Sequence, residues 1–168
     1  LVSLNLAGGG AQKVLLNQAR EFAINGCKVD IILLKNKVEH TIDVDLYDIH
    51  FLSQSRYISK NKFINYYYFL RKLQNLMKFL QINGKFDLVL SHSYDTDQLL
   101  KFMKDINKYS YIHASMSFHI SNYSFIKKIL YKYIYDNENI LTVSDCVKKD
   151  FLRKCKMKPK TIKTIYNL

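Results

Sequence analysis

The sequence predicts an α/β protein with a Rossmann-like parallel sheet flanked by helices. Short apolar runs, of which 31–34 is typical, alternate along the chain with stretches whose apolar residues recur at helical spacing. A glycine-rich turn, formed by Gly8, Gly9 and Gly10, joins the first apolar run to the first helical stretch. Strands that alternate with helices build a parallel sheet with helices on both faces.

Each element follows from the same patterns. The first strand is expected within residues 1–6, and the helix after the glycines is expected to stop at Asn25-Gly26. The later strands are expected at 28–34, 45–52, 86–90, 109–112, 139–143 and 161–166, and the later helices at 61–82, 95–106, 121–135 and 145–155. The apolar stripe expected on the helix over 61–82 consists of Phe63, Tyr66, Leu70, Leu73, Met77 and Leu80.

Composition indicates one folded domain over residues 1–168. Hydrophobic residues make up 48% of the chain, and a single proline with five glycines leaves little room for a linker. Three scattered cysteines without a Cys-x-x-Cys motif argue against a disulfide framework or a zinc site and fit a reducing compartment. No apolar run reaches the roughly 18 residues that a membrane-spanning helix needs. We therefore expect a cytoplasmic protein, and its first and last residues suggest a piece of a longer chain.

The glycine turn points to phosphate chemistry. Glycines allow the backbone to approach a ligand, and a helix N-terminus offers unpaired N–H groups and positive potential. Lys13 and Gln12 occupy positions where a dinucleotide fingerprint would need glycine, and no P-loop sequence is present. A phosphate-binding turn that belongs to neither motif is expected, with Lys13 as a nearby cation, and a tight turn without a ligand is the alternative.

The positive charge of the chain predicts an anionic partner. The formal net charge is +12, although the composition is rich in lysine throughout. Residues 49–86 contain no Asp or Glu, and their seven basic residues are Arg56, Lys60, Lys62, Arg71, Lys72, Lys78 and Lys85. A helix with Arg71, Lys72 and Lys78 beside an aromatic face fits an anionic membrane surface or a lipid-linked pyrophosphate. An ordinary solvated helix is the alternative.

Polar residues follow the expected strands at their carboxyl ends, where ligands of such sheets bind. The candidates are His92 with Ser93, His113 with Ser115, and Ser144. The serines have a second role available, since Ser93 and Ser144 each stand where they would cap the following helix. His113 is the strongest candidate ligand contact, with a structural imidazole as its alternative.

Several motifs, in one order along nearly the whole chain, carry a resemblance to a known family. They are the runs LAGGGAQKV (6–14), GCKV (26–29), DLVLSHS (87–93), YIH (111–113), ILTVSDCVKKDF (140–151) and IKTIYN (162–167). Together they resemble the N-terminal half of a GT-B fold glycosyltransferase of family 4. Gln12 and Lys13 stand where the family has Glu and Arg, so the positive charge is kept and the carboxylate is lost.

The resemblance implies a function and roles for these residues. It implies an acceptor-side domain of a retaining glycosyltransferase that moves a sugar from a nucleotide-sugar donor to a glycan or lipid-linked acceptor, in the synthesis of surface polysaccharide, lipopolysaccharide or glycoprotein glycans. His113 would contact the transferred sugar, and Gly8, Gly9, Gly10 and Lys13 would face the donor diphosphate. His92, Ser93, Ser115 and Ser144 would lie on the acceptor or substrate side.

The resemblance also bears on cofactors and on a second domain. No cofactor or metal is expected, because N–H groups and a cation can stabilise the leaving diphosphate. The donor-binding C-terminal domain of the family is absent from this chain, so the chain alone is expected to be inactive. The protein is expected in the cytoplasm, peripheral on the inner face of the membrane.

Two other functions are open at this point. The net charge would suit a nucleic-acid-binding domain, but no helix-turn-helix, zinc-finger or RNA-binding sheet motif is present, so no nucleic acid is expected as a partner. A GT-B-like nucleotide-sugar epimerase would share the fold, but the turn at residues 8–13 favours a transferase.

Overall fold

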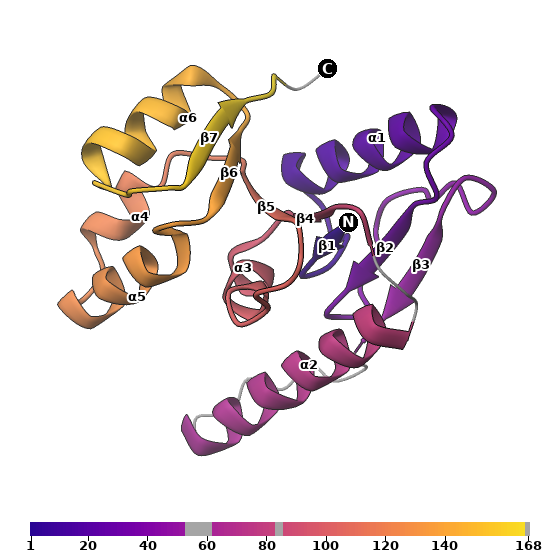
Figure 1. The fold of residues 1–168 in the computed structure, drawn as a ribbon, viewed down its shortest axis with the longest axis horizontal. Coiled ribbons are helices and arrows are strands. Elements are labelled where there is room, and N and C mark those ends of the chain that lie inside the picture. Colours follow the sequence, from indigo (N-terminus) through magenta and orange to yellow (C-terminus); the bar gives the residue numbers. More distant parts are fainter. Residues whose placement is uncertain (53–61, 83–85, 167–168) are drawn as a thin grey trace.

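The structure is a computed structural model that describes residues 1–52, 62–82 and 86–166. Within these residues, seven parallel strands form one sheet in the order β3-β2-β1-β4-β5-β6-β7, which confirms the predicted α/β class (Figure 1). The strands are β1 (Val2–Ser3), β2 (Asp30–Leu33), β3 (Asp48–Phe51), β4 (Val89–Ser91), β5 (Lys108–Ile112), β6 (Asn139–Thr142) and β7 (Thr161–Thr164). All of the strand pairs are parallel.

Helices cover both faces of the sheet, as expected. They are α1 (Gly10–Ile24), α2 (Lys62–Ile82), α3 (Tyr94–Leu100), α4 (Ser117–Ser121), α5 (Phe125–Tyr135), α6 (Asp145–Lys149) and a π-helical turn η1 (Asp150–Lys154). Figure 1 shows α1 on one side of the sheet and α2 on the other. None of the described helices is long and apolar enough to cross a membrane.

The side chains of each strand divide between two apolar layers because neighbouring residues point to opposite faces. On the α1 face, Leu15 and Ala19 pack with Ile31 and Leu33 of β2. On the opposite face, Leu76 of α2 and Leu99 of α3 pack with residues of β1, β2 and β4. The second layer continues under α5 and η1, where Tyr135 and Phe151 are fully buried against Ile140.

The buried face of α2 differs from the predicted stripe. Leu76 and Leu80 are buried, with Phe69, Leu73 and Phe79 packed beside them. Of the predicted stripe, Phe63, Tyr66, Leu70 and Met77 are exposed, whereas Leu80 is buried and Leu73 is partly buried. The helix is apolar on more than one side, so its hydrophobic spacing allowed two stripes, and contact with the sheet selected the second.

Three predicted helices are shorter than expected. The helix over 95–106 ends at Leu100 because the Lys108 ammonium donates to the carbonyls of Leu100 and Met103, which closes its last turn. The helix over 121–135 begins four residues later, as α5, and the short helix α4 that precedes it over 117–121 was not predicted. The helix over 145–155 widens into η1, where the Cys155 N–H donates to the Asp150 carbonyl five residues earlier.

Candidate functional site

The carboxyl ends of four strands bring predicted site residues to one edge of the sheet. The chain runs from β1 toward the glycine turn, from β4 into His92, from β5 into His113, and from β6 to Ser144. Strand β1 lies between β2 and β4, so the chain leaves β1 in one direction and later returns to its other side. This reversal of strand order is the position where open α/β sheets bind their ligands.

The glycine turn has a backbone that favours glycine. Gly8 has φ of 41° and Gly9 has φ of 118°, which are values that side chains with a Cβ rarely adopt. A Cβ on Gly9 would lie 2.9 Å from Gln12 Oε1, whereas a Cβ on Gly10 would meet nothing within 4 Å. No side chain caps the start of α1, and Lys13 is exposed in its first turn. The N-terminus of α1 therefore keeps N–H groups available for an anion.

His92 and His113 contact each other. His92 Nδ1 lies 3.1 Å from His113 Nε2, and the two rings stack with centroids 5.2 Å apart. The Tyr111 ring packs against both imidazoles, and its centroid lies 5.3 Å from that of His92 and 4.7 Å from that of His113. The backbone N–H of His92 donates to the Val2 carbonyl, which fixes the end of β4 to β1. Sequence spacing placed the two residues on one edge but did not predict this hydrogen bond.

Burial keeps both imidazoles neutral. Burial lowers the pKa of His113 to about 4. Burial, and then the proximity of His113, lowers the pKa of His92 well below its usual value. In a neutral pair one nitrogen of the contact carries the proton and the other accepts it, so the two rings have the same tautomer, either both Nδ1–H or both Nε2–H.

The outer nitrogens of the pair are unpaired. His92 Nε2 and His113 Nδ1 are buried, and neither has a hydrogen-bond partner among the described residues. Because the two rings have the same tautomer, one of these two nitrogens is a donor and the other an acceptor. A buried polar atom without a partner costs about 1–3 kcal/mol, so these atoms are suited to hydrogen-bond a hydroxyl group.

The three predicted serines have structural contacts. Ser93 caps α3 by accepting from the Thr96 N–H, and Ser144 caps α6 by accepting from the Val147 N–H. Ser115 is exposed and interacts with Asp150. The capping alternative given for Ser93 and Ser144 is therefore the role that the geometry shows.

Asp150 holds the segment after His113 and was not predicted as a site residue. Its carboxylate accepts from the N–H groups of Met116 and Ser117 and from the Ser117 hydroxyl. Burial would raise the pKa of Asp150, but these hydrogen bonds, with one from Ser115, lower it to about 2. A carboxylate one residue before the fully buried Phe151 was the available signal in the sequence.

The basic residues of α2 belong to a separate element from the glycine turn and the histidine pair, although Lys72 interacts electrostatically with Lys35, which follows β2, and with Asp95 of α3. Arg71 and Lys78 are exposed, and the Arg71 guanidinium lies 5.9 Å from the ring centre of Tyr67. Lys72 is half-buried, and its pKa is lowered mainly by burial and to a smaller extent by the nearby charge of Lys35. The Lys62 backbone begins α2, and Arg56, Lys60 and Lys85 lie outside the described residues.

A sizeable hollow among the described residues does not coincide with the predicted site. It has a volume of about 810 Å³ and lies between α1 and the sheet face formed by β4 to β7. Phe22, Tyr109, Leu141 and Ile165 are among its lining residues. None of the predicted site residues lines it, although Tyr111 borders both this hollow and the histidine pair.

One group in the described part of the chain has the donor atoms of a metal site. Asp30, Asp48 and His50 lie together on β2 and β3. They lie near the amino ends of these strands, away from the glycine turn and the histidine pair. The sequence analysis assigned them no role.

Comparisons with known proteins agree with the geometry. A family model described as Glycosyltransferase Family 4 matches residues 8–168. The fold is similar to sucrose-phosphate synthase from Thermosynechococcus elongatus, with a TM-score of 0.70, 14% sequence identity and coverage of 98% of this chain. The chain spans 47% of that protein, and at this identity the likeness shows the fold alone. No curated protein matches the sequence significantly.

Proposed function

The chain belongs to Glycosyltransferase Family 4, and from that premise we propose that it is the acceptor-side domain of an enzyme that transfers a sugar from a nucleotide-sugar donor to a glycan or lipid-linked acceptor. The observation that carries the proposal is the neutral His92–His113 pair, which lies at the same edge of the sheet as the glycine turn. Neutral imidazoles suit the hydroxyl groups of a sugar, and an uncapped helix N-terminus suits a diphosphate.

The glycine turn serves the leaving group in this proposal. The bond between the anomeric carbon and the diphosphate oxygen breaks, and its electron pair goes to the diphosphate. The oxygen of the acceptor hydroxyl bonds to the same face of the sugar and its proton passes to the departing diphosphate oxygen, which makes the enzyme retaining. N–H groups at the start of α1 and the Lys13 ammonium stabilise the charge on the diphosphate. These groups supply positive charge, so the proposed step uses no metal or cofactor.

His113 serves the transferred sugar. Its unpaired Nδ1 hydrogen-bonds a sugar hydroxyl, and His92 holds the tautomer and orientation of the ring through the 3.1 Å contact. His92 has a further unpaired nitrogen, its buried Nε2. Ser93, Ser115 and Ser144 line the acceptor side mainly as supports, since two of them cap helices and Ser115 contacts Asp150.

A second domain completes the proposed enzyme. The chain spans 47% of the structure that it resembles, and we take residues 1–168 as one domain. A C-terminal domain that binds the donor nucleotide would complete the site, so this chain alone would be inactive.

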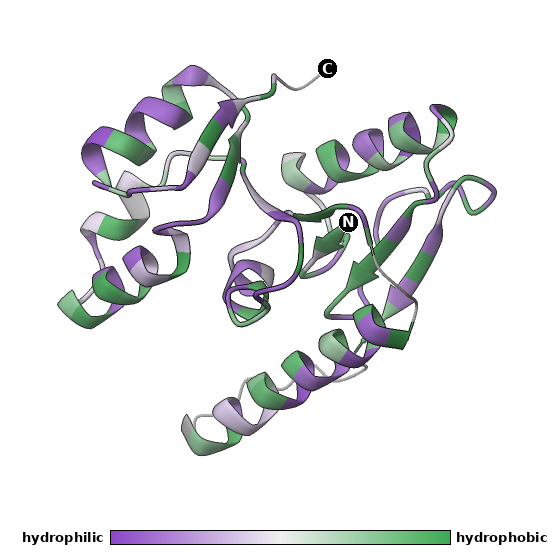
Figure 2. Cartoon of the chain, viewed as in Figure 1, coloured by the Kyte–Doolittle hydropathy of each residue, from purple (hydrophilic) through white to green (hydrophobic). Residues whose placement is uncertain are grey.

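The acceptor and the location follow from α2. This helix exposes aromatic side chains beside Arg71 and Lys78, and Phe63 and Tyr66 are 85% and 62% exposed. Figure 2 shows hydrophobic and hydrophilic residues interspersed along α2. Such a surface suits anionic lipid or a lipid-linked pyrophosphate. We place the enzyme on the inner face of the membrane, in the synthesis of surface polysaccharide, lipopolysaccharide or glycoprotein glycans.

A donor screen tests the proposal. The complete protein is incubated with UDP-, GDP- and ADP-sugars, and nucleotide release is measured. We expect release from the sugars of one nucleotide, increased by a suitable acceptor. Failure with every donor, together with salt-sensitive binding to oligonucleotides, would contradict the proposal and favour a nucleic-acid-binding function.

A further inference from the structure

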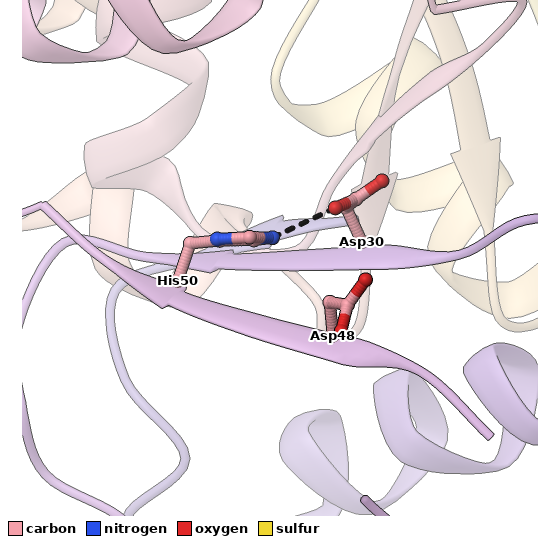
Figure 3. Close-up of side chains that lie close together, drawn as sticks. All are labelled: Asp30, Asp48 and His50. Carbon is pink, nitrogen blue, oxygen red and sulfur yellow. Dashed lines mark hydrogen bonds and ion pairs between the residues drawn. The ribbon is translucent and has the colours of Figure 1, made fainter. Parts of the chain in front are cut away.

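Two adjacent strands place two carboxylates and an imidazole side by side. Asp30 opens β2 and Asp48 opens β3, and the two residues are partners in the parallel register. His50 follows two residues after Asp48, so it lies on the same face of β3. Figure 3 shows the three side chains close together on these strands. Their donor atoms all lie within 4.8 Å of one another.

The cluster is held on one side and open on the other. His50 Nε2 lies 2.7 Å from Asp30 Oδ1, and the Phe79 ring of α2 packs 4.5 Å from the imidazole centre. The side chains of Asp30 and His50 are 13% and 32% exposed, and Asp48 is exposed. An ion could therefore enter from the side of Asp48 and keep water as a further ligand.

The protein groups leave one carboxylate without a cation. His50 pairs with Asp30, and within the described residues the Asp48 carboxylate has neither a hydrogen bond nor an ion pair. Like charges on directly paired residues of adjacent strands are destabilising. In this arrangement the His50 imidazole bonds the Asp30 carboxylate and not that of Asp48, whereas a divalent ion bound by all three side chains would contact both carboxylates.

We propose that Asp30, Asp48 and His50 bind a divalent first-row transition-metal ion of the zinc class. Zinc binds imidazole nitrogen and carboxylate oxygen at about 2.0–2.2 Å, which places tetrahedral donors roughly 3.3 Å apart. The three donor atoms lie within 4.8 Å of one another, so side-chain rotations would bring them to that spacing. Mg²⁺ and Ca²⁺ prefer six or more oxygen ligands, which makes the imidazole unfavourable for them.

The ion would be structural. The cluster lies near the amino ends of β2 and β3, whereas the glycine turn and the histidine pair lie at the carboxyl ends of other strands. Strand β3 stands at the edge of the sheet and pairs only with β2 in the described residues. An ion that bridges Asp30 and Asp48 therefore fastens the edge strand to the sheet, and it takes no part in sugar transfer.

Metal titration tests the site. Zn²⁺ is titrated into the purified protein by calorimetry, and Co²⁺ is added separately to record the visible absorption of a four-coordinate ion. We expect one equivalent to bind and the melting temperature to rise by about 5 °C at a hundredfold excess of Zn²⁺ over its Kd. Mg²⁺ at the same concentration should leave the melting temperature unchanged.

Variants assign the binding to these side chains. Asp48→Asn and His50→Gln should each remove the bound equivalent and the Co²⁺ absorption. Asp45→Asn, which changes an exposed acid of the same β2–β3 connection, should retain both. Asp48 is exposed, so its variant should fold even if His50→Gln does not. A bound equivalent that survives Asp48→Asn, or no binding to the wild-type protein, would overturn the proposal.

Discussion

At the scale of single residues, the site depends on burial more than on charge. His92 and His113 share a hydrogen bond, and burial makes the protonated form of either ring unfavourable. The pair therefore offers a donor and an acceptor to its surroundings without a net charge. Asp150 has the opposite role, since it stays ionised and uses its charge to fix the backbone that follows His113.

The lowered pKa of His113 predicts how stability depends on pH. Between pH 6.5 and 4 the unfolded chain binds a proton at this residue and the folded protein does not, so stability falls as pH falls through this range. Allowing for partial exposure of the ring, we expect the free energy of unfolding to fall by about 2 kcal/mol over this range. The His113→Gln variant should not show this fall. Urea unfolding from pH 7 to 4 measures it.

Asp97 acts in the opposite direction and serves as the control. Burial raises its pKa to about 6, so the folded protein retains a proton that the unfolded chain loses as pH rises from about 4 to 6. Asp97 therefore lowers the free energy of unfolding as pH rises through this range, and it offsets the effect of His113. In Asp97→Asn this offset is absent, so the free energy of unfolding should fall more steeply as pH is lowered. An unchanged pH profile in His113→Gln would contradict the neutral pair.

Removal of the Asp150 carboxylate should loosen the segment after His113. Asp150→Ala leaves the N–H groups of Met116 and Ser117 without their acceptor. We expect a loss of about 3 kcal/mol in the free energy of unfolding, together with reduced sugar transfer. Asp145→Ala is the matched control, because that carboxylate is exposed and bonds only to the hydroxyls of Thr164 and Tyr166, and it should cost less than about 1 kcal/mol.

At the scale of elements, the start of α1 and the outer face of α2 carry separate parts of the proposed function. Helix α1 begins without a side-chain cap directly after two glycines with positive φ. Helix α2 buries one stripe against the sheet and exposes a second, aromatic stripe beside its basic residues.

The glycine turn allows a comparison of neighbouring positions. Gly9→Ala requires a Cβ at φ of 118° and within 2.9 Å of Gln12 Oε1, so we expect about 1–3 kcal/mol of strain and a large loss of donor turnover. Gly10→Ala meets no protein atom within 4 Å and adds no backbone strain, so we expect it to lose less turnover than Gly9→Ala. Nucleotide release by the two variants is the measurement. Equal effects would show that the backbone of Gly9 is unimportant for the site.

Charge reversal on α2 tests membrane contact. The combined change of Arg71, Lys72 and Lys78 to Glu should weaken binding to anionic vesicles by at least tenfold, at about 1 kcal/mol per basic residue. A control variant with Lys104, Lys158 and Lys160, which are exposed, changed to Glu has the same net charge as the α2 variant. Its binding to the vesicles should be weakened less. Sedimentation with vesicles measures both, and unchanged binding of the α2 variant would rule out this surface.

At the scale of the whole molecule, local patterns predicted the strands and the edge at which the site forms. Alternation of strands and helices fixed the parallel sheet, and residues such as His113 could be placed because they directly follow a strand. Contacts between distant elements could not be predicted. The buried face of α2 depends on the sheet beneath it, and the end of α3 depends on Lys108 from the next strand.

The same limit explains which parts of the site were missed. The hydrogen bond between His92 and His113, and that between Asp150 and Ser117, join residues 21 and 33 positions apart. Ser93 and Ser144 were placed correctly along the chain, but the sequence left open whether they cap a helix or contact a ligand. Only the arrangement of the N–H groups around them showed that they act as caps.

The central claim is that the edge formed by the glycine turn and the histidine pair acts on a nucleotide-sugar. The most direct test is the rate of sugar transfer by the complete protein with its preferred donor, compared among wild type, His113→Ala, Lys13→Ala and the control Lys104→Ala. The account predicts at least a hundredfold loss in the His113 and Lys13 variants, since each removes a contact to the reacting donor. The exposed Lys104, changed to Ala, is the control for a near-normal rate. Full activity in both His113→Ala and Lys13→Ala would contradict the account.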